Sequence, residues 1–380
     1  MILDYETLKL VWWVLVGVLL IGFAVTDGFD MGAGALLPFL GKTDEERRVI
    51  INTVGPHWDG NQVWFITAGG AIFAAWPAVY AAAFSGFYIA MLLVLFALFF
   101  RPVGFDYRSK IEDPRWRSIW DWGLFVGGAV PALLFGVAFG NVILGVPFQL
   151  DEFLRPTYTG SFFGLLHPFA LLAGIVSLSM LVMHGAVWLQ MRAEDMIADR
   201  ARKAAMFAAL VMIVAFGAAG LWVAFGIEGY HIVTQPAHDA MPNPLAKVVE
   251  VGQSAWMANY HTYGWMMAAP VLGFAGALMV ILCAFRNRPG RAFLASALSM
   301  TGVILTAGFS LFPFVLPSST SHNSSLTLWD ASSSHLTLTV MFWAAAIFVP
   351  IILMYTVWTY RAMWGRVTVQ QIRDNAHSAY

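Results

Sequence analysis

Long apolar runs separated by short polar segments extend along nearly the whole chain. A helix needs about 20 predominantly apolar residues to cross the hydrocarbon core of a bilayer. Runs of this length predict eight membrane-spanning helices, over residues 8–28, 78–101, 120–141, 162–190, 205–228, 263–285, 291–314 and 335–360. The segments between them are too short for a separate soluble domain, so we expect residues 1–380 to form one polytopic membrane domain.

The distribution of Lys and Arg decides whether a ninth, shorter apolar segment, residues 61–76, also spans the membrane. It contains two adjacent glycines and is followed by Pro77, so hydropathy alone leaves it undecided. Loops on the cytoplasmic side carry the excess of basic residues. If the segment spans, 18 of the 21 basic residues fall on one side, and only Lys9, Arg155 and Lys247 fall on the other. We therefore predict an all-α integral membrane protein with nine spanning helices, an external N-terminus and a cytoplasmic C-terminus.

The composition agrees with a membrane protein and argues against several other classes. Hydrophobic residues make up 59% of the chain and charged residues only 11%, whereas a soluble domain has about 25% charged residues. The net charge of −1 gives no general attraction for nucleic acid. The single cysteine, Cys283, forms no internal disulfide or cysteine-ligated cluster within this chain, and we predict no metal site. The sequence has no P-loop, which excludes an ATP-driven pump within this chain.

Two carboxylates, Asp27 and Asp30, interrupt the first apolar run. Their i, i+3 spacing places both on one face of a helix. At about 1.5 Å per residue from Trp12, Asp27 lies roughly 22 Å into the membrane. A charge near the membrane centre costs at least ~2.5–3.5 kcal/mol, so such residues face protein or water and often move protons or ions. The alternative is that the carboxylates, Asp30 above all, reach the cytoplasmic headgroups. Gly28 and Gly32 favour close approach of another helix to this face.

A second polar cluster, GPHWDGNQVW, begins the short span, and it includes His57, Asp59, Asn61 and Gln62. Imidazole and carboxylate groups exchange protons near neutral pH, so these residues suit a proton path. Asp59 is equally suited to cap the N-terminus of the helix.

A third cluster, FFRPVGFDYRSK, contains Arg101, Asp106 and Lys110. Arg101 either extends to the interface, as arginines at helix ends commonly do, or neutralises one of the buried aspartates. Asp106 and Lys110, spaced i, i+4, form either a proton uptake point or a solvated ion pair. In the fifth predicted helix, His184 is chemically able to bind haem iron, but no second ligand stands out, so we interpret it as a core histidine.

Five strings in the sequence resemble subunit II of the bacterial cytochrome bd-type quinol oxidases. They are TDGFDMG (26–32), PHWDGNQVW (56–64), FFRPVGFDYR (99–108), FPFVLPSST (312–320) and WDASSSHLTL (329–338). The similarity extends over the whole chain, which makes it specific. It implies nine helices in two four-helix bundles plus one peripheral helix, in the inner membrane of a bacterium.

The resemblance also implies an activity, cofactors and partners. Such an oxidase oxidises quinol, reduces dioxygen to water and generates proton-motive force without pumping. Haem b and haem d, or a haem b variant, are held by subunit I, to which this chain would bind as an obligate partner. One or more single-helix subunits often join the complex, and some members hold a structural quinone in subunit II.

Residues that match the family's proposed proton route from the cytoplasm are Asp27, Asp30, His57, Asp59, Arg101, Asp106 and Lys110. Trp64 matches a position near the proposed oxygen entrance. This chain would then carry no catalytic residue in the strict sense. Two other functions remain open from the residues alone. Polar groups at membrane depth and helices interrupted by glycine also suit a stand-alone secondary transporter or proton channel, and every aspartate could instead serve a purely structural scaffold subunit.

Overall fold

The computed structural model describes residues 3–374, apart from the side chain of Asp195. The α-helices are α1 (Tyr5–Leu40), α2 (Asp44–Val54), α3 (Trp58–Ala75), α4 (Pro77–Gly86), α5 (Tyr88–Leu98), α6 (Phe100–Tyr107), α7 (Pro114–Leu144), α8 (Pro168–Arg192), α9 (Asp195–Phe225), α10 (Ala258–Thr262), α11 (Ala268–Phe285), α12 (Pro289–Leu311), α13 (His335–Ala362) and α14 (Val369–Asp374). The strands are β1 (Phe148–Leu150), β2 (Pro156–Tyr158), β3 (Glu228–Thr234), β4 (Val248–Gln253), β5 (Phe314–Leu316) and β6 (Leu326–Thr327). They form three antiparallel pairs, β1 with β2, β3 with β4 and β5 with β6. The membrane-spanning part is therefore all-α, as expected, and strands occur only in connecting segments.

Across residues 3–374, eight helical segments are long and apolar enough to span a membrane, and the bent pair α3–α4 makes a ninth if it counts as one span. The predicted segment 61–76 is helix α3. The chain then turns by 120° into α4, which begins at Pro77. Proline lacks a backbone N–H and its ring clashes with the preceding turn, which favours a break at this residue, and Pro77 takes the first position of α4.

The prediction of a single helix over residues 78–101 is wrong, because this segment is divided between separate helices in the structure. Helix α4 ends at Gly86, and the next candidate span runs from Tyr88 to Lys110 through α5 and α6. Hydropathy does not detect the division, since the residues on both sides of it are apolar. The first helix is also longer than the predicted 8–28. It continues to Leu40 because the polar residues that end the apolar run are buried inside the protein.

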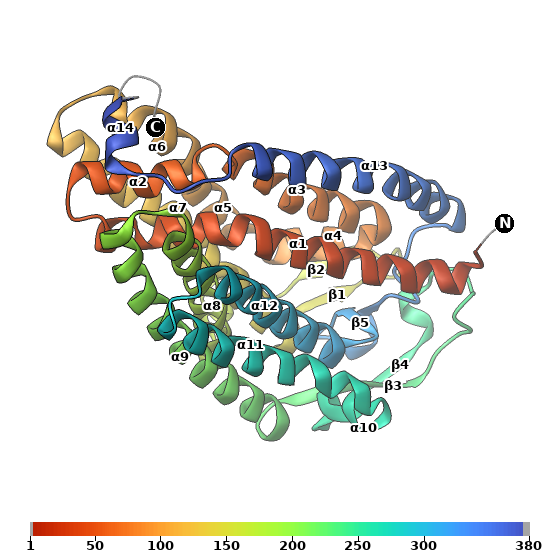
Figure 1. Ribbon diagram of the computed structural model, residues 1–380. Coiled ribbons are helices and arrows are strands. Elements are labelled where there is room, and N and C mark those ends of the chain that lie inside the picture. The colour runs from red at the N-terminus through yellow and green to blue at the C-terminus, as the bar shows by residue number, and fades with distance from the viewer. Residues whose placement is uncertain (1–2, 375–380) are drawn as a thin grey trace.

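The spanning helices form two groups of four and one outlying helix (Figure 1). Helices α1, α3, α5–α6 and α7 make the first group, and α8, α9, α11 and α12 make the second. Helices α1 and α7 both pack against α8, which joins the groups. Helix α13 makes few contacts, to α1 and α3, and only 6% of its spanning window is buried. The start of α1 and helix α14 lie at opposite ends of the molecule, with the strand pairs nearer the start of α1 and with α2 and α6 near α14 (Figure 1).

Glycine residues allow α1 to touch its neighbours backbone to backbone. A Cβ atom added at Gly32 would collide with the Leu181 carbonyl oxygen of α8 and lie 2.9 Å from the Cα of Gly185. A Cβ at Gly128 of α7 would likewise collide with the Met31 carbonyl oxygen of α1. This confirms the close helix approach predicted for the glycine-containing face of α1, and it fixes the depth and rotation of the helix that carries both aspartates.

Gly32→Ala should therefore weaken the packing of α1 on α8. We expect the free energy of unfolding to fall by about 1–3 kcal/mol, because extra atoms in a closely packed interface force backbone shifts. The measurement is the melting temperature of the purified protein in detergent. Gly17→Ala is the matched control on the same helix, since a Cβ there meets nothing within 4 Å. Equal melting temperatures for the two variants would contradict the assignment.

Candidate functional site

Residues 27–37 of α1 are enclosed by protein. Every residue from 27 to 37 is buried, and the exposed fractions of Asp27 and Asp30 are 0% and 1%. Neither carboxylate extends outward, so the alternative that they reach the cytoplasmic headgroups is wrong. Both acidic groups lie in the interior, where their charge requires partners from the protein itself.

Arg101 supplies the partner of Asp27. Its Nη1 and Nη2 atoms donate to the two carboxylate oxygens of Asp27 at 2.8 and 2.5 Å. The arginine side chain is 2% exposed, and its guanidinium lies 5.7 Å from the centre of the Trp58 ring. The paired alternative for Arg101 is thus confirmed and the interfacial one is wrong. A two-pronged pair of this kind fixes both the position and the orientation of the carboxylate.

Asp30 is held by residues from two other helices. Asn61 Nδ2, in α3, donates to Asp30 Oδ2 at 2.8 Å. The Tyr360 hydroxyl, near the end of α13, donates to Asn61 Oδ1 at 2.6 Å. The second carboxylate oxygen of Asp30, Oδ1, is buried and accepts no hydrogen bond from any residue that the structure describes. This oxygen is the open position in the network.

His57 lies beside this network, in the segment that links α2 and α3. Its ring stacks on that of Tyr360, with the centroids 4.9 Å apart and the planes 17° from parallel. Nδ1 lies 3.4 Å from the Val54 carbonyl oxygen, and Nε2 is buried without a hydrogen-bond partner among the described residues. Burial lowers the pKa of the imidazole to about 4, so the ring is neutral near pH 7.

Three of the predicted residues do not join the buried network. Asp59, Asp106 and Lys110 are all exposed. Asp59 is the second residue of α3, and the residue at the N-cap position is His57, so the capping role suggested for Asp59 is wrong. Asp106 and Lys110 form no ion pair with one another in the described structure, so that alternative is wrong as well. All three lie on segments at the α2 and α6 end of the bundle.

Trp64, the residue matched to an oxygen entrance, is half-buried on α3. Its ring lies over Gly22 of α1, where an added Cβ would come within 2.8 Å of the indole. The position is a helix–helix contact that only glycine permits, and it places the indole one helical turn along α3 from Asn61.

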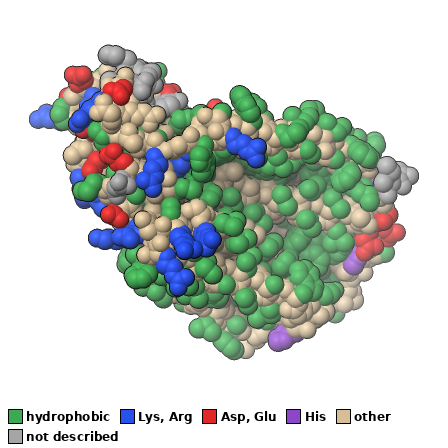
Figure 2. Space-filling model, viewed as in Figure 1, with side chains coloured by type: hydrophobic (Ala, Val, Ile, Leu, Met, Phe, Trp, Pro, Cys, Tyr) green, Lys and Arg blue, Asp and Glu red, His purple; other side chains and the backbone are tan. Residues whose placement is uncertain are grey.

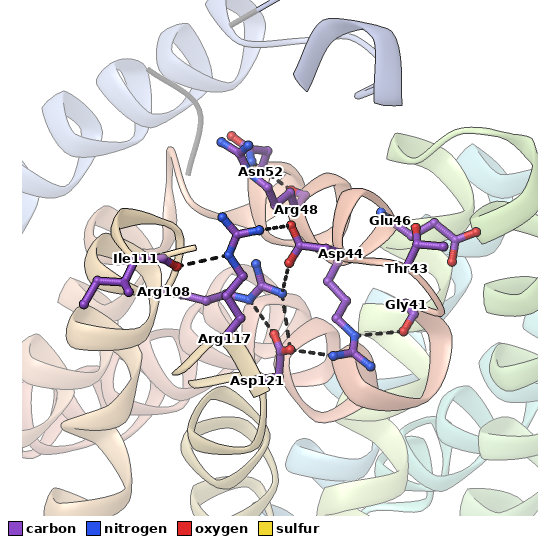
Figure 3. Close-up of polar contacts among 11 residues, drawn as sticks. Gly41, Thr43, Asp44, Glu46, Arg48, Asn52, Arg108, Ile111, Arg117 and Asp121 are labelled. Carbon is purple, nitrogen blue, oxygen red and sulfur yellow. Dashed lines mark hydrogen bonds and ion pairs between the residues drawn. The ribbon is translucent and has the colours of Figure 1, made fainter. Parts of the chain in front are cut away.

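A cluster of ion pairs fixes the end of α6, the helix that carries Arg101 (Figure 3). Arg108 donates to Asp121 of α7 at 2.5 Å through Nε and to Asp44 of α2 at 2.9 Å through Nη2. Arg108 and Asp121 are each 1% exposed, so solvent screens their attraction little. Two further arginines bind the same two carboxylates, Arg47 and Arg117. The cluster joins α2, α6 and α7. Arg101 lies about two helical turns before Arg108, so the cluster also fixes the position of the helix that carries Arg101.

The charge balance of the site is uneven. One guanidinium, from Arg101, faces two carboxyl groups, and Asp27 and Asp30 are close enough to influence one another electrostatically. With both carboxyls ionised the cluster carries an excess negative charge, and with one proton bound it is neutral. Two carboxyl groups that influence one another in this way favour the binding of a proton by one of them. The arrangement can therefore bind and release one proton inside the protein.

His184 does not contribute to this site. Its Nδ1 lies 2.7 Å from the Ser296 hydroxyl and its Nε2 lies 3.0 Å from the Val25 carbonyl oxygen. Both ring nitrogens are thus engaged within the protein, in agreement with a core histidine. The structure also places no group of three or more His, Cys, Asp or Glu side chains suited to a metal ion within residues 3–374.

Asn61 and Tyr360 belong to the network but are absent from the proton route predicted from the sequence. Asn61 lies within the PHWDGNQVW string, so its polar side chain at a helix start was a usable signal. Tyr360 is 299 residues from Asn61 in the chain, and a tyrosine at the end of an apolar helix is typical of an interfacial anchor. Only the packing of α13 on α3 brings it to the network.

Comparison with known proteins identifies close similarities to one family. The family model described as cytochrome bd terminal oxidase subunit II matches residues 8–363. The chain is 58% identical to the cytochrome bd-I ubiquinol oxidase subunit 2 of Escherichia coli (strain K12) over 378 residues, which cover 100% of both chains. It is 32% identical to the cytochrome bd ubiquinol oxidase subunit 2 of Bacillus subtilis (strain 168), over 94% of this chain and 96% of the relative. A chain in the structure of bd oxidase from Geobacillus thermodenitrificans has the same fold, with a TM-score of 0.69 at 14% identity, over 95% of this chain and 100% of that chain.

Proposed function

The chain belongs to the family of cytochrome bd terminal oxidase subunit II, and on this basis we propose that it lines a proton route in a quinol-oxidising, oxygen-reducing complex. The chain is a subunit of a terminal oxidase of this type, which separates it from the stand-alone transporter. The complex generates proton-motive force when protons for water formation come from one side of the membrane and quinol protons leave on the other. The step proposed for this subunit is the delivery of protons for water formation from the cytoplasmic side.

The observation that carries the proposal is the buried pair of carboxyls that share one arginine. Asp30 Oδ1 has no hydrogen-bond partner in the described structure, and a proton bound there neutralises the excess charge beside Asp27. Asn61 and Tyr360 hold the carboxyl in place, and neutral His57 lies next to Tyr360. The exposed groups at the same end of the bundle supply the uptake surface in this proposal: Asp59, Asp106 and Lys110.

The direction of uptake follows from the basic residues. The end of the molecule that holds α2, α6 and α14 carries most of the Lys and Arg side chains, and we propose that it faces the cytoplasm. At the other end, Lys247 pairs with Asp330 at 2.9 Å. Lys9 donates to the carbonyl oxygens of His238, Ala240 and Trp329. These two lysines are buried structural groups, so they add little positive charge to the surface at that end. The difference in charge between the two faces is therefore larger. The N-terminus is then external, in the inner membrane of a bacterium.

We further propose that subunit I covers the face of this chain that α3 and α13 form. Helix α13 is nearly unburied in its spanning window, and Ile66 of α3 is 67% exposed. A partner on this face would lie next to Tyr360 and the carboxyl pair. Single-helix subunits would add to the same complex, and Trp64, on α3, would lie close to an oxygen path at this boundary.

The haems of the complex, haem b and haem d or a haem b variant, belong to subunit I in this proposal and supply electrons and bind oxygen there. Neither of the two buried histidines in the described structure fits haem ligation: His184 has both nitrogens engaged and His57 is packed against Tyr360. A structural quinone in this subunit would place its apolar tail in the hollow that Figure 2 shows on the apolar face, between α13 and the α11–α12 pair.

Asp30→Asn tests the proton route in the assembled oxidase. The amide keeps an oxygen that accepts from Asn61 but cannot take up a proton at neutral pH. We expect oxygen reduction per haem to fall at least about tenfold, a conservative figure beside the roughly 10²–10⁴-fold typical of a positioned proton-transfer group, while haem content and assembly stay unchanged. Asp199→Asn, at an exposed position on α9, is the control and should keep full turnover.

Two other results would change the assignment. If haem content and assembly fall in step with activity, Asp30 serves the scaffold and not the route. If turnover and voltage generation in proteoliposomes both stay at the unmodified level, protons do not pass through Asp30.

A further inference from the structure

A groove lies between α11 and α12 where the two helices meet at their tight turn, at the same end of the molecule as α2 and α14. Its volume is about 360 Å³. Its lining divides into a basic part and an apolar part. The arginines are Arg286, Arg288 and Arg291, and the apolar residues are Met279, Leu282, Cys283, Leu294, Ala295 and Leu298.

The three arginines have no carboxylate partner in the described structure. They lie within six residues of one another and all are exposed. Other arginines at this end of the molecule are neutralised by nearby acids, as Arg200 is by Glu46 and Arg202 by Asp199. Three adjacent guanidiniums repel one another unless an anion lies between them. The groove therefore presents an uncompensated positive site.

The start of α12 strengthens this positive field. The helix begins at Pro289 with no acidic residue in its first turn and no side-chain cap. The N-terminal end of a helix carries a partial positive charge and free backbone N–H groups, both of which favour an anion. Arg288 and Arg291 lie on either side of this helix start. The positive charge of the arginine side chains and the partial positive charge of the helix N-terminus thus lie together at the start of α12.

The apolar part of the groove faces outward along the membrane-spanning surface. Met279 and Leu282 of α11 are 49% and 50% exposed, and Leu294 and Leu298 of α12 are 62% and 43% exposed. Leu294 and Leu298 are four residues apart, so they lie on one face of α12. Cys283 and Ala295, which are small and buried, make the floor. A hydrocarbon chain fits this surface, and a free inorganic anion would leave it uncovered.

The position of the groove matches the boundary between the membrane and the aqueous phase. The arginines follow directly after the last apolar residue of α11 and precede the apolar run of α12. Figure 2 shows Lys and Arg side chains gathered at this end of the molecule, bordering the continuous apolar surface. A molecule with an anionic head and an apolar tail would place its head at the arginines and its tail along the two helices.

We propose that this groove binds one anionic phospholipid, with the phosphate between the guanidinium groups of Arg286, Arg288 and Arg291 and an acyl chain along α11 and α12. Guanidinium groups bind phosphate oxygens in pairs of parallel hydrogen bonds. Basic pockets between spanning helices are a known way of selecting anionic lipid headgroups. The site is independent of the proton route, because it lies on the second group of helices, away from α3 and α6.

The test uses the complete purified oxidase and counts bound lipid by native mass spectrometry. After delipidation, the complex is titrated with phosphatidylglycerol, with phosphatidylcholine and with inorganic phosphate. We expect one site for phosphatidylglycerol whose affinity falls at least tenfold in the R286Q/R288Q/R291Q variant. The matched control is R115Q/K203Q/R361Q, which removes three exposed basic residues from the same end of the molecule and should keep the site.

Further variants and outcomes keep the proposal open to refutation. If the triple variant does not assemble, R288Q alone should still weaken phosphatidylglycerol binding, and L298W should do so by filling the apolar part without changing the charge. Equal binding of phosphatidylglycerol by the unmodified complex and the arginine variants would overturn the proposal. So would equal affinity for phosphatidylcholine, or full displacement of the lipid by inorganic phosphate, which would indicate a site for a free anion.

Discussion

Arg101→Leu should prevent assembly of a stable oxidase. The substitution leaves the Asp27 carboxylate, 0% exposed, without the guanidinium that binds both of its oxygens. Removing one partner of a buried ion pair costs about 3–5 kcal/mol, because an uncompensated charge stays in the interior. The loss is expected as a sharp fall in the melting temperature and haem content of the purified complex. Arg115→Leu, at an exposed position at the start of α7, is the control and should leave both unchanged.

The double variant D27L/R101L distinguishes charge balance from proton transfer. Replacing both members of a buried ion pair with apolar residues of similar volume is often neutral or stabilising. We therefore expect assembly and haem content to recover, while oxygen reduction per haem stays low because a carboxyl of the route is missing. If the double variant assembles and also turns over normally, the pair is purely structural. If it assembles no better than R101L, the uncompensated charge is not the cause of the defect.

The pairing of Arg101 with an aspartate was one of the two alternatives that the sequence left open, and burial in the membrane favours it. A carboxylate at the depth of Asp27 needs a nearby cation, and the neighbouring apolar helices offer few. The exposure of Asp59, Asp106 and Lys110 was not predictable in the same way. Near the interface, burial and exposure cost similar free energies, so the spacing of the residues does not decide between them.

The fold was predictable to the extent that hydropathy determines it. The number of spans follows from the long apolar runs and from the distribution of basic residues, whereas their grouping into two bundles and one peripheral helix was implied by the family resemblance. The division between α4 and α5 was not predictable, because a lipid-facing helix and a break inside apolar sequence have the same composition. The position of α13 was also hidden, since a helix that contacts lipid or a partner on most sides shows no periodic polar face. For that reason the contact between Tyr360 and Asn61 required the structure.

Asn61→Leu should give the second large effect, because one side chain satisfies two buried groups. Its loss leaves Asp30 without its hydrogen-bond donor and the Tyr360 hydroxyl without its acceptor. Each unsatisfied buried group costs about 1–3 kcal/mol. Tyr360→Phe removes only the second bond, so its effect should be smaller. Gln62→Leu is the matched control on the next residue of α3, since no hydrogen bond of its side chain is present in the described structure.

The expected order of melting temperatures is therefore Gln62→Leu, then Tyr360→Phe, then Asn61→Leu as the lowest. Oxygen reduction per haem should fall in the same order, because Asp30 is positioned for proton transfer only while Asn61 holds it. A larger loss of turnover in Tyr360→Phe than in Asn61→Leu would mean that the tyrosine hydroxyl itself carries the proton. Equal behaviour of Asn61→Leu and Gln62→Leu in both measurements would show that the network does not hold Asp30, and the route would then have to bypass α3.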